Sequence, residues 1–177
     1  MKKIFLLLLI LTATSVSTFA QKFAYVDSEY IMQNIPEYND AQAQLDELSA
    51  AWQQELEAKF KSIDKMYKDY QAESVLLPDE MKRKREEAIV AAEKEAKDLQ
   101  KKRFGKDGDM FKKRQELIKP IQDKVFNAIS QFATSKNYAM IFDKSGSVTV
   151  MFADPKYDIS DNILEEMGYS FNTKKNK

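Results

Sequence analysis

The middle of the chain, residues 37–119, has a repeating pattern of apolar positions in a mostly polar and charged background. An apolar residue recurs every three or four positions, which places these residues in one narrow stripe along a helix, as in a coiled coil. A turn signal interrupts the pattern at Pro78-Asp79, because proline fits the first turn of a new helix and an acidic residue is stabilised there. The pattern therefore predicts two long helices folded back on each other, with the tip of the hairpin near residues 77–80.

The two predicted helices, residues 37–77 and 79–119, differ in charge and in the size of their apolar residues. The first has nine acidic and four basic residues, a net charge of −5, and the second has ten acidic and fourteen basic residues, a net charge of +4. Opposite charges favour this antiparallel partner over a copy of the same helix. Large residues facing small ones also let the helices approach closely. The first stripe comprises Leu45, Leu48, Trp52, Leu56, Phe60, Ile63, Tyr67 and Tyr70, and the second comprises Met81, Ala88, Ala92, Ala96, Leu99, Met110 and Leu117, with Ile89 close to it.

Two glycines, Gly105 and Gly108, interrupt the second helix. Each costs about 1 kcal/mol in a helix interior relative to alanine. If the hairpin bends at Pro78, Gly105 faces the small residues 49–51 of the first helix, and the glycine pair is predicted to form a hinge. A plain turn between the glycines would instead produce a spectrin-like bundle of three helices. The periodicity leaves both arrangements open.

The flanking segments, residues 21–36 and 120–177, are more apolar and predict a small β-rich body, so that the fold class is α+β. Three short runs rich in β-forming residues, 22–26, 138–142 and 148–152, are predicted strands, and the last two are spaced as a β-hairpin. Strands this short and apolar would leave edges and one face exposed, which predicts self-association through the body. The residues expected in this contact are Phe23, Tyr25, Val26, Met140, Ile141, Phe142, Val148, Val150 and Phe152.

Composition limits the chemistry that is available to the chain. Its 177 residues include no Cys and no His, so it lacks a thiol nucleophile, the usual proton shuttle near neutral pH and the usual zinc ligands. The carboxylates of Asp143, Asp154 and Asp158 lie where Asp commonly ends a strand or begins a helix, and no metal or other cofactor is predicted. We therefore do not expect an enzyme. Basic clusters flanked by acidic residues also do not predict nucleic-acid binding.

The first twenty residues have the organisation of a secretory signal peptide. Lys2 and Lys3 precede a continuous apolar run over residues 4–11, and that run is too short to span a bilayer. Thr18-Phe19-Ala20 supplies small residues at the positions expected before a cut, so we predict cleavage after Ala20. The mature chain would have 26 basic and 28 acidic residues, a net charge of −2, and we expect it to be soluble outside the inner membrane.

The segments, taken in this order, resemble the Skp/OmpH family of periplasmic chaperones, and the resemblance covers the whole mature chain. It implies a homotrimer in which strands of three chains form a shared barrel and three hairpins hang from it, as in a jellyfish, around a cavity. It also implies that unfolded outer-membrane proteins are held in that cavity without ATP. The resemblance rests on Phe23-Ala24-Tyr25-Val26-Asp27, Pro36-Glu37, Pro120-Ile121, Lys124, Ala128-Ile129, Tyr138-Ala139-Met140-Ile141-Phe142-Asp143, Asp154-Pro155 and Asp158-Ile159-Ser160.

Two functions are carried forward, an ATP-independent periplasmic holdase and a structural coiled-coil spacer or adaptor of the cell envelope. A holdase needs a weak, distributed contact surface, and aromatic and Met side chains adapt to many partners. The same side chains could instead form the seam of the hairpin, as we expect for Phe60. Candidates for client contact are Trp52, Met66, Tyr67, Tyr70, Phe104 and Phe111.

The tip combines apolar residues with a basic cluster, which suits weak contact with an anionic membrane surface. In the alternative arrangement, Val75 and Leu76 cap the seam between the helices and the basic cluster is a solvated helix face. The candidates for tip contact are Leu76, Leu77, Lys82, Arg83, Lys84 and Arg85.

Overall fold

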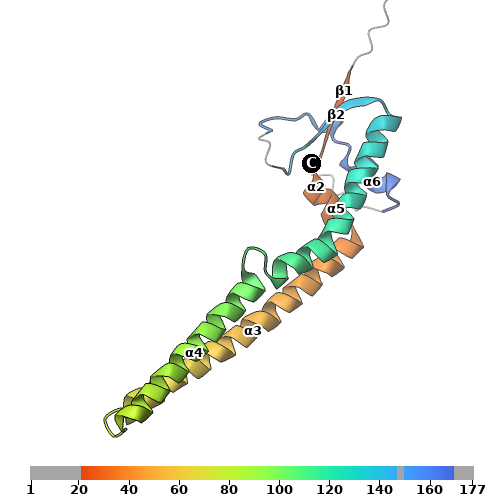
Figure 1. Ribbon diagram of the computed structural model, residues 1–177. Coiled ribbons are helices and arrows are strands. Elements are labelled where there is room, and N and C mark those ends of the chain that lie inside the picture. The colour runs from red at the N-terminus through yellow and green to blue at the C-terminus, as the bar shows by residue number, and fades with distance from the viewer. Residues whose placement is uncertain (1–20, 147–149, 170–177) are drawn as a thin grey trace, which may run out of the picture.

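The computed structural model describes residues 21–146 and 150–169. Within them the chain forms a long helical hairpin that projects from a small body (Figure 1). The predicted signal peptide, residues 1–20, lies outside the described residues. The elements are β1 (Lys22–Val26), α2 (Ser28–Gln33), α3 (Pro36–Glu73), α4 (Asp79–Phe104), α5 (Asp109–Ser135), β2 (Tyr138–Asp143), the 3-10 turn η1 (Pro155–Tyr157) and α6 (Ser160–Glu166).

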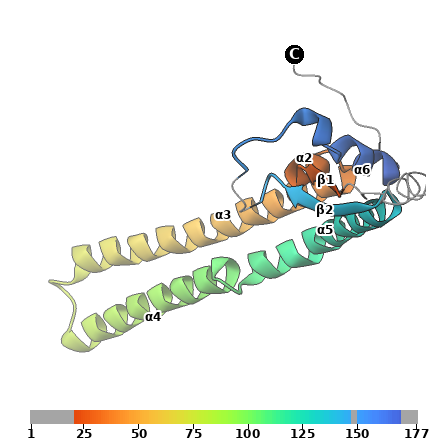
Figure 2. The same ribbon diagram turned by 90° about the horizontal axis from the view of Figure 1, so that it is seen from above.

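The predicted hairpin is confirmed. Helix α3 has 38 residues, which corresponds to about 57 Å at 1.5 Å per residue. Helices α4 and α5 follow one another along α3 and both pack against it, so the alternative of a three-helix bundle is wrong (Figures 1 and 2). The helical conformation is interrupted between α4 and α5, but the chain does not reverse its direction there.

The second arm also continues further than its sequence suggests. Helix α5 runs unbroken through Pro120 to Ser135, so the arm and the body share one helix and no boundary falls at residue 120. Proline removes the hydrogen bond to the carbonyl of Glu116. Both residues are exposed, and water can solvate that carbonyl, which explains why the helix tolerates the proline.

The tip lies slightly earlier than predicted. Helix α3 ends at Glu73, and Pro78 precedes α4 with an extended backbone, φ −62° and ψ 152°. Because proline disfavours a helical conformation for the residue before it, Leu77 cannot readily extend α3. The turn therefore occupies the residues between Glu73 and Asp79, rather than residues 77–80.

A seam of buried apolar side chains joins the two arms. Leu56 and Ile63 of α3 and Ile89 and Ala96 of α4 are buried, and the two residues within each helix are seven apart, as in a heptad. Ile89 takes the place that the periodicity assigned to Ala88, which is exposed. The large residues of α3 therefore face one large and one small residue, so that only part of α4 presents a small surface.

Ion pairs between the arms are few and partly exposed. Arg85 to Glu73, at 3.4 Å, and Arg103 to Glu55, at 3.4 Å, join a basic residue of the second arm to an acidic residue of the first, as the net charges predict. Lys59 to Glu95, at 2.7 Å, has the opposite polarity. Exposed pairs contribute about 0–1 kcal/mol each. They therefore help to select which helices pair, but they add little to the stability of the hairpin.

The body is built around one apolar cluster, to which α2, α6, the second half of α5 and the start of α3 all contribute. Five side chains of this cluster are almost completely inaccessible to solvent. They are Ile31, Ile35, Leu45, Ile163 and Leu164.

The sheet of the body differs from the predicted arrangement. Strand β2 pairs in parallel with β1, with Tyr25 opposite Phe142, instead of forming a hairpin with residues 148–152. Residues 148 and 149 lie outside the described residues, and 150–152 are not a strand. The chain leaves β2 through a hydrogen bond from Lys144 to Val26 and returns at the opposite edge of β1, where Asp158 bridges Tyr25. Residues 150–152 therefore have no strand beside them within the described chain.

Candidate functional site

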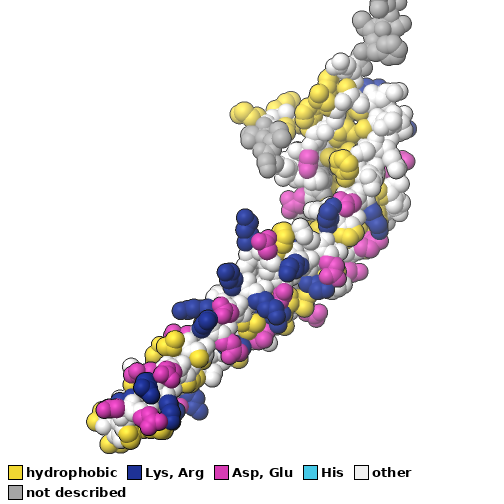
Figure 3. All heavy atoms as spheres, viewed as in Figure 1, with side chains coloured by type: hydrophobic (Ala, Val, Ile, Leu, Met, Phe, Trp, Pro, Cys, Tyr) yellow, Lys and Arg dark blue, Asp and Glu magenta, His cyan; other side chains and the backbone are white. Residues whose placement is uncertain are grey.

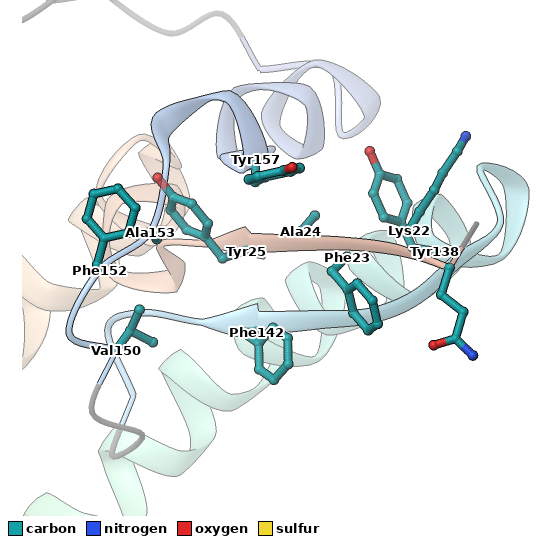
Figure 4. Close-up of a pocket in the computed structure, with 11 residues that line it drawn as sticks. Lys22, Phe23, Ala24, Tyr25, Tyr138, Phe142, Val150, Phe152, Ala153 and Tyr157 are labelled. Carbon is teal, nitrogen blue, oxygen red and sulfur yellow. The ribbon is translucent and has the colours of Figure 1, made fainter.

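The body presents an open apolar face. A cavity of about 750 Å³ lies between the sheet and the segment that follows it, and both strands line it through Phe23, Tyr25 and Phe142 (Figure 4). Val150 and Phe152 contribute from the other side, and Phe152 is 85% exposed. A face this apolar on a two-stranded sheet is unusual for a chain that remains monomeric.

The residues predicted for self-association divide into two groups. Tyr25 and Val26 are buried within the chain itself, and Ile141 is half-buried. Val148 lies outside the described residues. The exposed members are Phe23, Met140, Phe142, Val150 and Phe152.

Charged side chains hold the rim of this face in position. Lys144 forms ion pairs with Asp27 at 3.2 Å and Asp158 at 3.7 Å, which ties the ends of both strands to the start of α6. Burial by itself lowers the pKa of Lys144, but these carboxylates outweigh it and raise the pKa above its usual value. Burial likewise favours a higher pKa for Asp143, whereas hydrogen bonds from Ser28 and Ser145 hold that pKa below its usual value.

The carboxylates of Asp143, Asp154 and Asp158 accept hydrogen bonds from neighbouring residues of the body. Asp143 accepts from Ser28 and Ser145, Asp154 from the backbone of Lys156, and Asp158 from Ser160. Across residues 21–146 and 150–169, no group of three His, Cys, Asp or Glu side chains could hold a metal ion.

On the arms, several of the candidate aromatics are engaged within the hairpin. The hydroxyl of Tyr67 donates to Glu93 at 2.9 Å, and that of Tyr70 donates to Glu86, so both connect α3 to α4. The rings of Trp52 and Phe104 meet edge to face, with centroids 6.2 Å apart. These four residues therefore contribute to the joining of the arms, although their rings remain partly accessible.

Met66 is half-buried and Phe111 is exposed. Figure 3 shows charged side chains of both signs along the viewed face of the hairpin, whereas apolar side chains gather on the body and at the tip. The structure thus leaves scattered apolar contacts on the arms and a continuous apolar area on the body.

Gly105 and Gly108 lie in the break between α4 and α5, where the backbone leaves no room for a larger side chain. Both have negative φ, which other residues also adopt. A Cβ atom on Gly105 would lie 2.3 Å from the carbonyl oxygen of Lys101, and one on Gly108 would lie 2.7 Å from that of Lys102. Alanine at either position would therefore disrupt the break rather than stiffen the arm.

We accordingly expect Gly105→Ala to lower the free energy of unfolding by more than about 1 kcal/mol, as strained glycine replacements do. The measurement is urea unfolding followed by circular dichroism. Gly146→Ala is the matched control, because a Cβ there would meet its nearest atom at 3.7 Å. Equal stability of the two variants would show that the close approach at Gly105 is easily relieved.

The basic cluster at the tip is neutralised by neighbouring acids. Lys82 pairs with Asp79, Arg83 with Glu87, Lys84 with Glu80 and Arg85 with Glu73, at 2.8–3.7 Å. Val75 and Leu76 are 88% and 87% exposed, so they do not cap the seam, while Leu77 is half-buried. Contact of the tip with a membrane surface would thus depend on this apolar pair more than on charge.

Sequence patterns missed the residues that organise these sites. Arg103 was one member of a basic triplet, and Lys144 was part of a loop. No spacing rule indicated that Arg103 would contact Glu55 and Asp109, which are 48 and 6 residues away in the chain. None of the helices that the structure describes is long and apolar enough to cross a membrane.

Within the described residues, a long helical hairpin projects from a small body that presents an open apolar face. The chain belongs to the OmpH-like family of outer membrane proteins, whose sequence model matches residues 22–167. No curated protein matches it significantly.

Among solved structures, the fold is similar to that of a candidate OmpH-like outer membrane chaperone from Caulobacter crescentus CB15. The TM-score is 0.65, the sequence identity is 14%, and the match covers 82% of this chain and 83% of the other. The match to the family model confirms the family resemblance seen in the sequence. At this identity the structural likeness concerns the fold.

Proposed function

We propose that this protein is an ATP-independent periplasmic holdase that binds unfolded outer-membrane proteins and prevents their aggregation. Membership of the OmpH-like family supports a chaperone role. The observation that carries the proposal is the open apolar face of the body, where Phe23, Phe142 and Phe152 are exposed beside a two-stranded sheet. We propose that three chains cover this face by joining their strands, which would hold three hairpins side by side around a space for the client.

The arms have properties that suit a holdase. Their aromatic residues are scattered and only partly accessible, and charges of both signs separate them. Each contact with an unfolded chain would be weak, and many would act together, so that a client could be bound and later released.

The test is suppression of aggregation. An outer-membrane β-barrel protein denatured in urea is diluted with the mature protein, without nucleotide, and light scattering is followed. We expect scattering to fall to near the baseline at roughly one trimer per client, because each cavity encloses one chain. The control is the variant Phe142→Asp, which should not assemble. Its arms would then have no neighbouring arms with which to enclose a client.

A structural spacer would give a different result. If the protein remains oligomeric but does not change the scattering at any ratio, it does not hold unfolded clients. The helical hairpin would then serve as a spacer or adaptor in the envelope.

A further inference from the structure

The returning arm keeps its direction across a break that should weaken it. Residues 105–108, between α4 and α5, are not helical, and glycine is one of the residues at which helices commonly kink. One side chain crosses the break. Arg103, in the last turn of α4, reaches Asp109 at the start of α5 with 2.8 Å between Nη1 and Oδ2.

The same guanidinium group also reaches the other arm. Its Nη2 lies 3.4 Å from Oε2 of Glu55 on α3, and its central carbon lies 4.7 Å from the centre of the Trp52 ring. Phe104 packs edge to face against Trp52 at 80°. Trp52, Glu55, Arg103, Phe104 and Asp109 together form what we call the Arg103 clasp, which connects three helices at one point.

Several features make this clasp easy to open. Its three charged side chains are only partly buried, with 24%, 41% and 27% of Arg103, Glu55 and Asp109 exposed, so salt screens their attraction. The Nε atom of Arg103 is buried without a hydrogen-bond partner among the described residues, which disfavours the closed state.

The charges around the break also favour opening of the clasp. Lys101, Lys102, Lys106 and Lys112 line an open hollow at residues 105–108, and like charges this close repel one another. Asp98, Asp107 and Asp109 in the same hollow reduce that repulsion without removing it, since four lysines face three aspartates.

We propose that the Arg103 clasp is a latch. When closed, it holds α4 and α5 in line. When it opens, the returning arm bends at residues 105–108 and uncovers the rings of Trp52 and Phe104 as an additional apolar surface for an unfolded client. The bending concerns this chain alone, whereas the part about the client depends on the proposed holdase function.

The bending is tested first, without a client. The chain has no Cys, so cysteines introduced at the exposed positions Lys97 of α4 and Gln115 of α5 can carry a pair of spin labels. Diluting the labelled protein with unlabelled protein restricts the measured distances to one chain. We expect a narrow distance distribution in the otherwise native protein and a broad one in Arg103→Met, which keeps an apolar side chain over Trp52 but removes both ion pairs.

Trp52 is the single Trp of the chain and reports the uncovering directly. We expect Arg103→Met to raise the constant for acrylamide quenching at least twofold. Raising NaCl to about 0.5 M should move the native protein towards this variant, because the Debye length then falls well below its value of about 10 Å at 0.1 M. Lys59→Met is the matched control, since it breaks another ion pair between the arms, to Glu95 at 2.7 Å, and should change neither readout.

An unchanged distance distribution and unchanged quenching in Arg103→Met would overturn the latch. If that variant does not fold, Glu55→Gln tests the same contact from α3 and should give a smaller change in the same direction. In the opened variant we expect an unfolded outer-membrane protein to bind about threefold more tightly. Opening without tighter binding would overturn the client part. Failure of all variants to bind any client would count against the holdase function, while the label and quenching results would still decide the latch.

Discussion

Phe142→Asp is expected to break the proposed oligomer into monomers with little change in helix content. Phe142 is 43% exposed on the open face of the body, so a polar residue there can remain hydrated in the single chain. In an assembly the same carboxylate would be buried among apolar side chains. Burying an unpaired polar group costs about 2 kcal/mol in proteins, and three such sites in a trimer would lower the association constant by about four orders of magnitude.

The measurement is sedimentation of the mature protein at micromolar concentration, with far-ultraviolet circular dichroism as the check on folding. Val90→Asp is the matched control, because Val90 is 61% exposed on α4, away from the body. That variant should sediment as the native protein does. A Phe142→Asp protein of native size would mean that assembly uses a different surface. If it is monomeric, the variant also supplies the control for the aggregation assay, since a separate chain has no enclosed cavity.

Leu45→Ala is expected to lower the free energy of unfolding by about 2–5 kcal/mol, the usual cost of such a truncation in a well-packed core. Leu45 is 1% exposed and belongs to the apolar cluster of the body. It lies on α3 at the level where the arm leaves the body, near the part of α5 that contains Ile118 and Ile121. The cavity left by the substitution would therefore weaken the junction through which both arms are held.

The effect is measured by urea unfolding at matched protein concentration, because association would otherwise change the apparent stability. Leu76→Ala makes the same chemical change at the tip, where Leu76 is 87% exposed, and should alter stability by less than about 0.5 kcal/mol. A similar small loss for Leu45→Ala would show that the junction repacks around the missing side chain.

The hairpin could be predicted because its signal is local. Leu56 and Ile63 recur with helical spacing, and Pro78 prevents one helix from continuing into the next. The strands at residues 22–26 and 138–142 were equally visible as apolar runs. Their pairing was not, because a strand can bond to any available edge, and the paired residues of β1 and β2 are at least 116 positions apart in the chain. The predicted strand at 148–152 depends on such an edge, and residues 150–152 have none within the described chain.

The candidate client surface could be predicted only as a set of residue types. Trp52 and Phe104 were recognised as aromatic positions, but their contact depends on the register of α3 against α4. Hydrophobic spacing alone does not fix that register to within several residues. Arg103 shows the same limit more clearly, because in the sequence it is one of many basic residues. Its partners Glu55 and Asp109 come from other helices.

The linear pattern of apolar, charged and turn-forming residues was enough to specify two long antiparallel helices, a small apolar body and the absence of His and Cys chemistry, since each follows from short-range spacing or from composition. The three-dimensional arrangement was needed to show that α5 joins arm and body as one helix, that β1 and β2 are parallel, and that Arg103 crosses the break at residues 105–108. The pairing of β1 with β2 and the contact of Arg103 with Glu55 join residues far apart in the chain, and such contacts are selected by packing and charge only once the elements meet.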